Sequence, residues 1–567
     1  MRKVVFFVLL FAIPHLATAQ EKTKYWIFLA DKQDISGKNT QVEEGYLTDK
    51  AITRRAQRGE VRSATMFALQ DAPISQVYEA DLQESGFKIE QRSRWLNAVT
   101  TLLSEEEAEQ ITALPYVRSI RPVARLSPAV LPRAPVSPVI PTRVSSNCPS
   151  SLLGDSCTQL DVVNAIPAIE RGINGSGVTL GLIDTNFSSD PTPPFSHPSL
   201  THIRTDDRLK GVRDFTQRDS SQPCLGTHSH GMAVASVAVG YDEGEIIGPG
   251  YGANIYAAVT ECTSYERNIE EDNFVAAVEW MEAEGVDVIT SSLGYFEFNL
   301  GQQSYTKGDL DGDTGVTTIV MDWAASRGII PITSAGNSGR EGPQTIGTPA
   351  DGDSVIAVGA VWPDGPIVAF SSRGPTADGR IKPDVSAQGI VVFLAAGARG
   401  YDISQGTSYS APMVAGIVTQ ILQVNPDLGP REVWHALTST ASQANSPDND
   451  LGWGIVNADA AIMHAIALNR SETDLPIPSD LTIHTPYPNP FQDVVHFTIE
   501  AVQPVPHARL VIIDVLGREV GTVYEGPIRT GGMPLQFDGA HLPPGVYAYT
   551  LDFDGRTRSG MLTRLGY

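Results

Sequence analysis

Residues 178–184 read VTLGLID, an apolar run that ends in an acidic residue, and they set the pattern for residues 148–468. Strand-like and helix-like runs alternate through this part of the chain, as in FVAAVEWMEAEG at 274–285 followed by VDVITSSLG at 286–294. This alternation predicts an α/β fold, a parallel sheet with helices on both faces. In such a fold the functional side chains lie beyond the carboxyl ends of the strands.

The stretch SQGTSYSAPMVAG at 404–416 places several hydroxyl side chains in front of an apolar run. Residues 411–422, with Pro412 near their start, predict a buried helix. A hydroxyl at its N-terminus lies where free backbone N–H groups and the helix dipole stabilise negative charge, which suits a nucleophile. A Ser or Thr cap on a core helix explains the same residues, so the partners must decide.

Three other positions offer the partners that a serine nucleophile needs. Asp184 ends the run 178–184, and His230 precedes the small-residue helical run 231–239. A serine needs a base, and the base needs a third group that fixes its tautomer. Asn337 follows a strand-like run and can donate to an oxyanion. Each residue alone is also explained as a turn or an exposed residue, but together they predict Ser408 as nucleophile, His230 as base and Asp184 as its orienting group.

The chain has 567 residues, too many for one core, and the first 19 suggest export. Arg2 and Lys3, an apolar run and Ala17-Thr18-Ala19 predict a signal peptide over 1–19. Its ten apolar residues are too few to span a bilayer, so we expect a soluble exported protein. The net charge of −24 argues against nucleic acid as a partner.

Composition divides the rest of the chain. Five prolines between 126 and 147 predict an exposed linker. A second proline-bearing segment, 471–480, predicts another linker. The tail that follows it shows the alternation of β-strands, and we expect it to be a β-sandwich. The N-terminal part predicts a small α+β domain with the order β-α-β-β-α-β. The predicted domains are 20–125 (α+β), 148–470 (α/β) and 481–567 (all-β).

Seven short motifs between residues 182 and 416 together form a specific family signature. They are LIDTN at 182–186, HGMAVAS at 230–236, SSLG at 291–294, SAGNSG at 334–339, FSSRGP at 370–375, KPDV at 382–385 and GTSYSAPMVAG at 406–416. Residues 148–468 therefore resemble the subtilisin-like serine proteases, and the order Asp, His, Ser agrees. Met232 replaces the threonine usual after His-Gly, and Asn186 replaces a usual glycine, but neither change removes a reacting group.

The resemblance implies a secreted endopeptidase that forms an acyl-enzyme, acts on proteins or peptides and requires no cofactor. It places the substrate cleft at Ser292, Leu293, Gly294, Ser334, Ala335 and Gly336, and the bottom of the primary pocket at Gly347, which favours a large apolar side chain. DLDGDT at 309–314 resembles part of a calcium loop but lacks a closing acid, since Val320 occupies that position. We expect a solvated insertion there and no assigned metal; the resemblance allows structural calcium elsewhere, without naming ligands.

The flanking regions fit the same interpretation. Residues 21–125 resemble the inhibitory propeptides of these enzymes, so the domain is expected to act as an intramolecular inhibitor. The tail, with YPNPF at 487–491 and LPPGVYAYTL at 542–551, resembles the sorting domains of the Bacteroidota type IX secretion system. That implies the secretion machinery as a partner and a secreted or cell-surface location. A generic β-sandwich adhesion module is the alternative for the tail.

All four cysteines follow the signal peptide, and an even number in an exported chain predicts disulfides. Three pairings are open; we predict Cys148 with Cys157 and Cys224 with Cys262. Metal ligation is disfavoured because no CxxC spacing occurs.

Two other functions are weighed against an endopeptidase. A serine esterase or lipase uses the same chemistry, but GTSYS at 406–410 is not the GxSxG elbow of that fold. A catalytically silent adhesin would leave four filled catalytic positions and an inhibitory domain unexplained. We expect the protein to be a monomer.

Overall fold

The computed structural model describes residues 22–33, 42, 45–59, 70–124, 152–189, 192–216, 229–262, 269–296, 304–473, 481–484, 486–489, 491–501, 504–513, 518–543, 545–553 and 556–564. The chain divides into two compact units, Met1–Asn469 and Arg470–Tyr567, which are described separately. The predicted signal peptide (1–19) and first linker (126–147) lie outside the described residues. No helix among those described is long and apolar enough to cross a bilayer.

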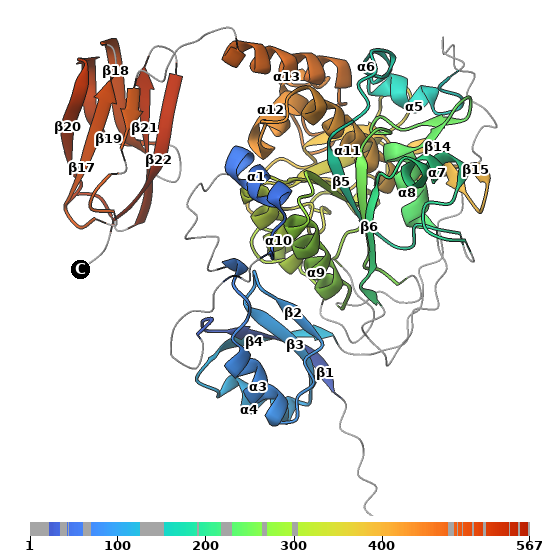
Figure 1. The fold of residues 1–567 in the computed structure, drawn as a ribbon, viewed down its shortest axis with the longest axis horizontal. Coiled ribbons are helices and arrows are strands. Elements are labelled where there is room, and N and C mark those ends of the chain that lie inside the picture. The colour runs from blue at the N-terminus through green and yellow to red at the C-terminus, as the bar shows by residue number, and fades with distance from the viewer. Residues whose placement is uncertain are drawn as a thin grey trace, which may run out of the picture. The chain divides into compact units, whose positions relative to one another are not determined.

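A seven-stranded sheet forms the centre of the first unit (Figure 1). Its order is β13-β12-β11-β10-β5-β9-β6, and all neighbouring strands are parallel. The predicted parallel sheet is therefore confirmed. The strands are β5 (Thr179–Asp184), β6 (Leu209–Asp214), β9 (Asn254–Val259), β10 (Val288–Ser291), β11 (Ile330–Ser334), β12 (Ile356–Val361) and β13 (Val385–Gln388).

Helices cover both faces of this sheet. On one face α8 (His230–Val239) packs against α11 (Thr407–Val424), and on the other α9 (Ile269–Ala283) packs against α10 (Val316–Ser326). All of β5 is buried, with Leu180 and Leu182 in the α8–α11 core and Ile183 in the α9–α10 core. Successive side chains of a strand point to opposite faces, so β5 contributes to both cores.

Further α-helices and strands complete this part of the chain. They are α5 (Cys157–Val162), α6 (Ile166–Glu170), α7 (Thr201–Thr205), α12 (Pro430–Thr440), α13 (Ala458–Thr473), β7 (Tyr241–Asp242), β8 (Ile246–Ile247), β14 (Ile390–Ala396) and β15 (Gly400–Gln405).

The N-terminal domain forms a four-stranded antiparallel sheet in the order β2-β3-β1-β4, with a core of its own. Its elements are β1 (Thr23–Leu29), α1 (Asp49–Arg58), α3 (Gln76–Glu84), β2 (Gln91–Ser93), β3 (Ala98–Leu103), α4 (Glu105–Thr112) and β4 (Val117–Ala124). This is the predicted order with one addition, α1. Ser104 and Glu107 form a capping box at the start of α4.

Helix α1 was not predicted, although the sequence carries end signals for it. The Thr48 hydroxyl accepts a hydrogen bond from the backbone N–H of Ala51, Asp49 lies in the first turn, and Arg55 and Arg58 lie in the last. Most of the described ionic partners of its side chains lie in the α/β domain; Asp71, which pairs with Arg55, lies in the N-terminal domain.

The second unit consists of two antiparallel sheets around one core, which confirms the predicted β-sandwich. One sheet has the order β16-β17-β20 and the other β19-β18-β21-β22. The strands are β16 (Leu481–Ile483), β17 (Val494–Ala501), β18 (Val505–Ile513), β19 (Glu519–Ile528), β20 (Gly531–Asp538), β21 (Gly545–Phe553) and β22 (Arg556–Arg564). In β17 buried residues alternate with exposed or half-buried ones, as expected for a strand with one face in the core.

Candidate active site

Asp184 and His230 are in direct contact at the carboxyl end of the central sheet. Asp184 is the last residue of β5 and fully buried, and His230 is the first residue of α8. The His230 Nδ1 atom lies 2.7 Å from Asp184 Oδ1, which also accepts the backbone N–H of Thr185 at 2.7 Å. A carboxylate only accepts hydrogen bonds, so it holds the proton on Nδ1 and leaves Nε2 free to act as a base.

The same contact sets the proton affinity of His230. Burial lowers the pKa of the imidazole, but the charge and hydrogen bond of Asp184 outweigh burial and raise the pKa above its ordinary value of 6.5. A raised pKa makes the neutral imidazole a stronger proton acceptor, as a general base requires.

Ser408 lies in the first turn of α11, which begins at Thr407 and not at 411 as predicted. Pro412 is therefore inside the helix, where it has no N–H to donate to the carbonyl of Ser408. That carbonyl instead accepts the Ser292 hydroxyl at 2.8 Å. The bond joins the end of β10 to the start of α11.

The Ser408 hydroxyl donates to the carbonyl oxygen of Ser292 over 3.4 Å, a long and weak hydrogen bond. Among the described residues it has no hydrogen bond to His230. The ring of Tyr409, the next residue, lies 5.8 Å from the His230 ring, so the first turn of α11 lies near the start of α8. Catalytic hydrogen bonds are often long or unaligned in a free enzyme and tighten around the substrate.

Asn337 follows β11 by three residues, and its side chain is fixed by Thr407. The backbone N–H and the hydroxyl of Thr407 both donate to Asn337 Oδ1 at 3.0 Å. A methyl group at Gly406 would lie 3.7 Å from Ser408 Cβ and 3.8 Å from Asn337 Nδ2, which places that nitrogen beside Ser408. The oxygen end of the amide is thus occupied and the donor end is left for a ligand.

Thr407 is a residue that the sequence analysis did not single out. It is fully buried, and its hydroxyl accepts the backbone N–H of Gly336 at 3.2 Å while donating to Asn337. We assign it a positioning role. The one feature of the sequence that could have pointed to Thr407 is its position directly before Ser408.

The predicted cleft residues follow two neighbouring strands. Ser292, Leu293 and Gly294 come directly after β10, and Ser334, Ala335 and Gly336 end or follow β11. β10 and β11 pair in parallel, so both segments leave the sheet at the same edge. Gly336 has a φ of +103°, a conformation that favours glycine.

Gly347 lies next to this edge. Tyr295 and Thr348 exchange backbone hydrogen bonds of 2.8 and 3.1 Å, which bring the Gly347 segment against the one that follows Gly294. A methyl group at Gly347 would lie 3.2 Å from the carbonyl oxygen of Tyr295, so the absence of a side chain allows this close approach. The proposed role in the primary pocket remains a prediction.

Cys157 and Cys262 are both disulfide-bonded. Their predicted partners, Cys148 and Cys224, lie outside the described residues, so the pairing remains a prediction.

In the DLDGDT segment, Asp311 Oδ1 accepts the backbone N–H groups of Asp313 and Thr314 at 2.9 Å, and Asp351 accepts that of Gly312 at 3.0 Å. The Asp311 and Asp351 carboxylates thus accept hydrogen bonds from the backbone of this segment. No group of three or more metal-ligating side chains occurs among the described residues.

Comparison with known families gives three matches that together cover most of the chain. Residues 175–454 match the subtilase family. Residues 24–134 match the peptidase S8 propeptide domain of Bacteroidota, and residues 485–561 match a secretion system C-terminal sorting domain.

Individual relatives agree with these matches. Subtilisin DY of Bacillus licheniformis is 31% identical over 307 residues, which are 53% of this chain and 97% of that protein. Subtilisin E of Bacillus subtilis is 26% identical over 402 residues, 70% of this chain and 88% of that protein. The serine protease AprX of Bacillus subtilis is 28% identical over 334 residues, 54% of this chain and 71% of that protein.

Proposed function

Because this chain belongs to the subtilase family of serine peptidases, which hydrolyse peptide bonds, we propose that it is a secreted endopeptidase with Ser408 as its nucleophile. The observation that carries this proposal is the 2.7 Å hydrogen bond between His230 Nδ1 and Asp184 Oδ1, with Ser408 and Asn337 at the same end of the sheet. The sorting domain indicates export and a cell-surface or secreted location.

The proposed reaction has two halves. His230 Nε2 takes the proton of the Ser408 hydroxyl, and the oxygen attacks the scissile carbonyl; His230 then gives the proton to the leaving amine. A water molecule, activated by the same histidine, hydrolyses the acyl-enzyme. The oxyanion of each tetrahedral intermediate accepts hydrogen bonds from Asn337 Nδ2 and the Ser408 backbone N–H.

The substrate is proposed to bind as an extended peptide along Ser292–Gly294 and Ser334–Gly336. Both segments continue parallel strands, so their backbone groups beyond the sheet can pair with an added strand. Strand addition recognises the peptide backbone and therefore accepts many sequences. Gly347 is proposed to lie at the bottom of the primary side-chain pocket.

The N-terminal domain is proposed to act as an intramolecular inhibitor. Its match to the S8 propeptide domain supports this role, and its contact with the α/β domain is extensive: Trp26 and Trp95 are buried in the α9–α10 core. The secretion machinery is the proposed partner of the tail, and a monomeric state remains a prediction.

Substrate choice and inhibition test the function. The mature enzyme should cleave an unfolded protein substrate and lose that activity on treatment with a serine-directed covalent inhibitor. Hydrolysis of a short-chain ester without cleavage of protein would favour an esterase. No hydrolysis of either by the mature form would favour a silent adhesin.

Asn337→Ala should lower kcat by about two to three orders of magnitude and leave KM nearly unchanged, because one oxyanion donor is lost and it acts on the transition state. Steady-state kinetics on a peptide substrate measures both. Thr407→Val is a milder control variant. It removes one of the two hydrogen bonds to Asn337 Oδ1, so kcat should fall less than in Asn337→Ala. An unchanged kcat in Asn337→Ala would make Asn337 a turn residue only.

The pH profile should follow His230. The base is active only when neutral, and its pKa is raised by Asp184, so kcat/KM should fall as the pH drops through a midpoint above 6.5. A flat profile across the neutral range, or a midpoint below 6.5, would contradict the assignment of His230 as a base paired with a carboxylate.

A further inference from the structure

Helix α1 belongs to the stretch that matches the propeptide, yet most of its described polar side-chain contacts are with the α/β domain. In Figure 1 it lies beside α10 and apart from strands β1–β4. The backbone N–H and the hydroxyl of Thr48, its N-cap, both donate to the carbonyl of Ala283, the last residue of α9, at 2.9 and 3.1 Å. A methyl group at Gly285 or Gly328, which follow α9 and α10, would come within 2.8 Å of α1 side chains.

Arg54 is the centre of this contact. Its guanidinium donates to the carbonyl oxygens of Val286 at 2.7 Å and of Glu282 and Arg327 at 3.2 Å. These carbonyls lie at the carboxyl ends of α9 and α10, where unpaired oxygens and the helix dipoles favour a cation. Arg54 also pairs with the Glu282 carboxylate, and both side chains are buried.

A second arginine completes a buried chain of alternating charges. Arg55 donates to both Glu282 oxygens, at 2.8 and 2.6 Å, and also pairs with Asp71 of the N-terminal domain. Glu282 is fully buried, and its described ionic partners are the two arginines of α1. A buried carboxylate is costly unless it is paired. Glu282 of the α/β domain therefore needs the arginines of α1, and these ion pairs link α1 to the α/β domain.

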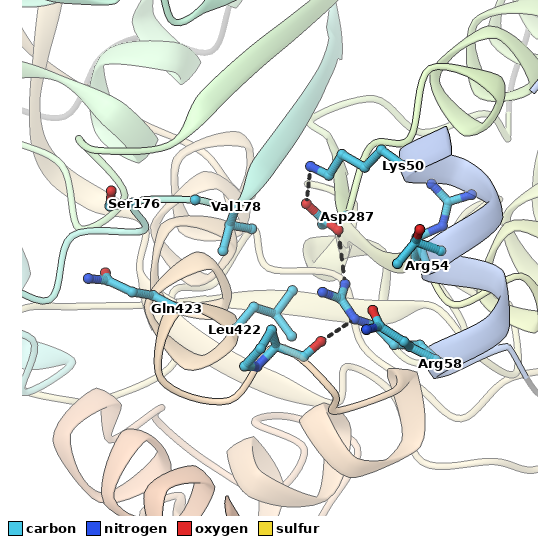
Figure 2. Close-up of a pocket in the computed structure, with 12 residues that line it drawn as sticks. Lys50, Arg54, Arg58, Ser176, Val178, Asp287, Leu422 and Gln423 are labelled. Carbon is cyan, nitrogen blue, oxygen red and sulfur yellow. Dashed lines mark hydrogen bonds and ion pairs between the residues drawn. The ribbon is translucent and has the colours of Figure 1, made fainter. Parts of the chain in front are cut away.

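At the outer edge of the contact Lys50 is partly open to solvent, whereas the side chains of Arg58 and Asp287 are only 6% and 5% exposed. Figure 2 shows Lys50 and Arg58 reaching Asp287 from two sides of a small pocket, over 2.6 and 3.1 Å. Arg58 also donates to the carbonyl of Pro426 at 2.5 Å. The Lys50 side chain is 42% exposed and that of Arg54 only 1%, so we expect Arg54 to contribute more.

The propeptide sheet has its own attachment to α9. The Ser93 hydroxyl and the backbone N–H groups of Arg94 and Trp95 donate to the carboxylate of Glu279. Lys24 of β1 pairs with Asp272 at 2.7 Å. This attachment lies along α9, whereas α1 occupies its carboxyl end.

We infer that the carboxyl ends of α9 and α10 form an interaction surface for an arginine-bearing helix, and that α1 is its occupant. This α9–α10 surface consists of Glu282, Asp287 and the carbonyl oxygens of Ala283, Val286 and Arg327. It gives the N-terminal domain a second anchor, which holds that domain on the enzyme after the connecting linker is cut.

The inference rests on the proposed inhibitory role of the N-terminal domain, but its test needs no peptidase activity. The full chain carries Ser408→Ala and a recognition sequence for an unrelated, specific protease within residues 126–147. After that protease has cut, native mass spectrometry and size-exclusion after dilution measure how fast the N-terminal fragment dissociates. Arg54→Ala should dissociate on the order of a hundredfold faster than the parent, because buried Glu282 keeps only one of its two arginines and the carbonyls of Glu282, Val286 and Arg327 lose their donor.

Arg92→Ala is the matched control. Arg92 is also in the N-terminal domain, but it pairs with Glu79 of the same domain and is 46% exposed, so the dissociation rate should not change. If Arg54→Ala does not fold, Lys50→Ala combined with Arg58→Ala removes the outer pairs and should dissociate on the order of tenfold faster. Dissociation at the parent rate in the folded variants would overturn the inference and leave the proposed peptidase activity untouched.

Discussion

Ser408→Ala is expected to lower peptide hydrolysis by about six orders of magnitude, to the level that binding and the oxyanion donors alone can support. The change removes the one oxygen that attacks the substrate. The proton acceptor His230 and the donor Asn337 stay in place, so substrate should still bind. Single-turnover kinetics on a peptide substrate, with binding measured separately, checks both statements.

The fold should tolerate this change. The Ser408 hydroxyl is half-buried and makes one long hydrogen bond, to the carbonyl of Ser292. Its loss should change the free energy of unfolding by less than about 1 kcal/mol. Residual activity near the parent level in a folded Ser408→Ala protein would rule out Ser408 as the nucleophile.

Asp184→Asn is expected to lower kcat/KM at neutral pH by about four orders of magnitude. The substitution keeps the shape of the side chain but places an amide where the carboxylate was. An amide N–H directed at His230 Nδ1 favours the tautomer with the proton on Nε2, and that nitrogen can no longer accept the Ser408 proton. The charge that raises the pKa of His230 is lost as well.

Two measurements check this prediction. Kinetics gives the loss of rate, and the pH profile, or NMR titration of the His230 ring, should show a lower pKa than in the parent. A loss of less than tenfold with an unchanged midpoint would mean that Asp184 only terminates β5.

The sequence predicted the parallel sheet and the places of the site residues for a common reason. In a doubly covered sheet the strands are apolar throughout, so β5 and β11 are visible as runs that end at Asp184 and shortly before Asn337. His230 was predicted at a helix start because small residues follow it without interruption. These features are local and need no knowledge of the fold.

Other features depend on contacts between distant residues. The apolar run and Pro412 predict a helix that begins near residue 411, but α11 begins at Thr407, because Asn337 and Ser292 satisfy backbone groups of its first turn. Helix α1 has few apolar residues, and two of its arginines, Arg54 and Arg55, pair with Glu282, more than 200 positions later in the chain. No local pattern predicts such partners.

Covalent labelling of the mature enzyme tests the central claim most directly. The enzyme is treated with a fluorophosphonate, the labelled residue is identified by peptide mass spectrometry, and the remaining peptidase activity is followed against the labelled fraction. We predict one adduct, on Ser408, with activity falling in proportion to its formation. Hydrolysis that persists when Ser408 is fully labelled, or inactivation by an adduct on another residue with Ser408 unmodified, would contradict the proposed mechanism.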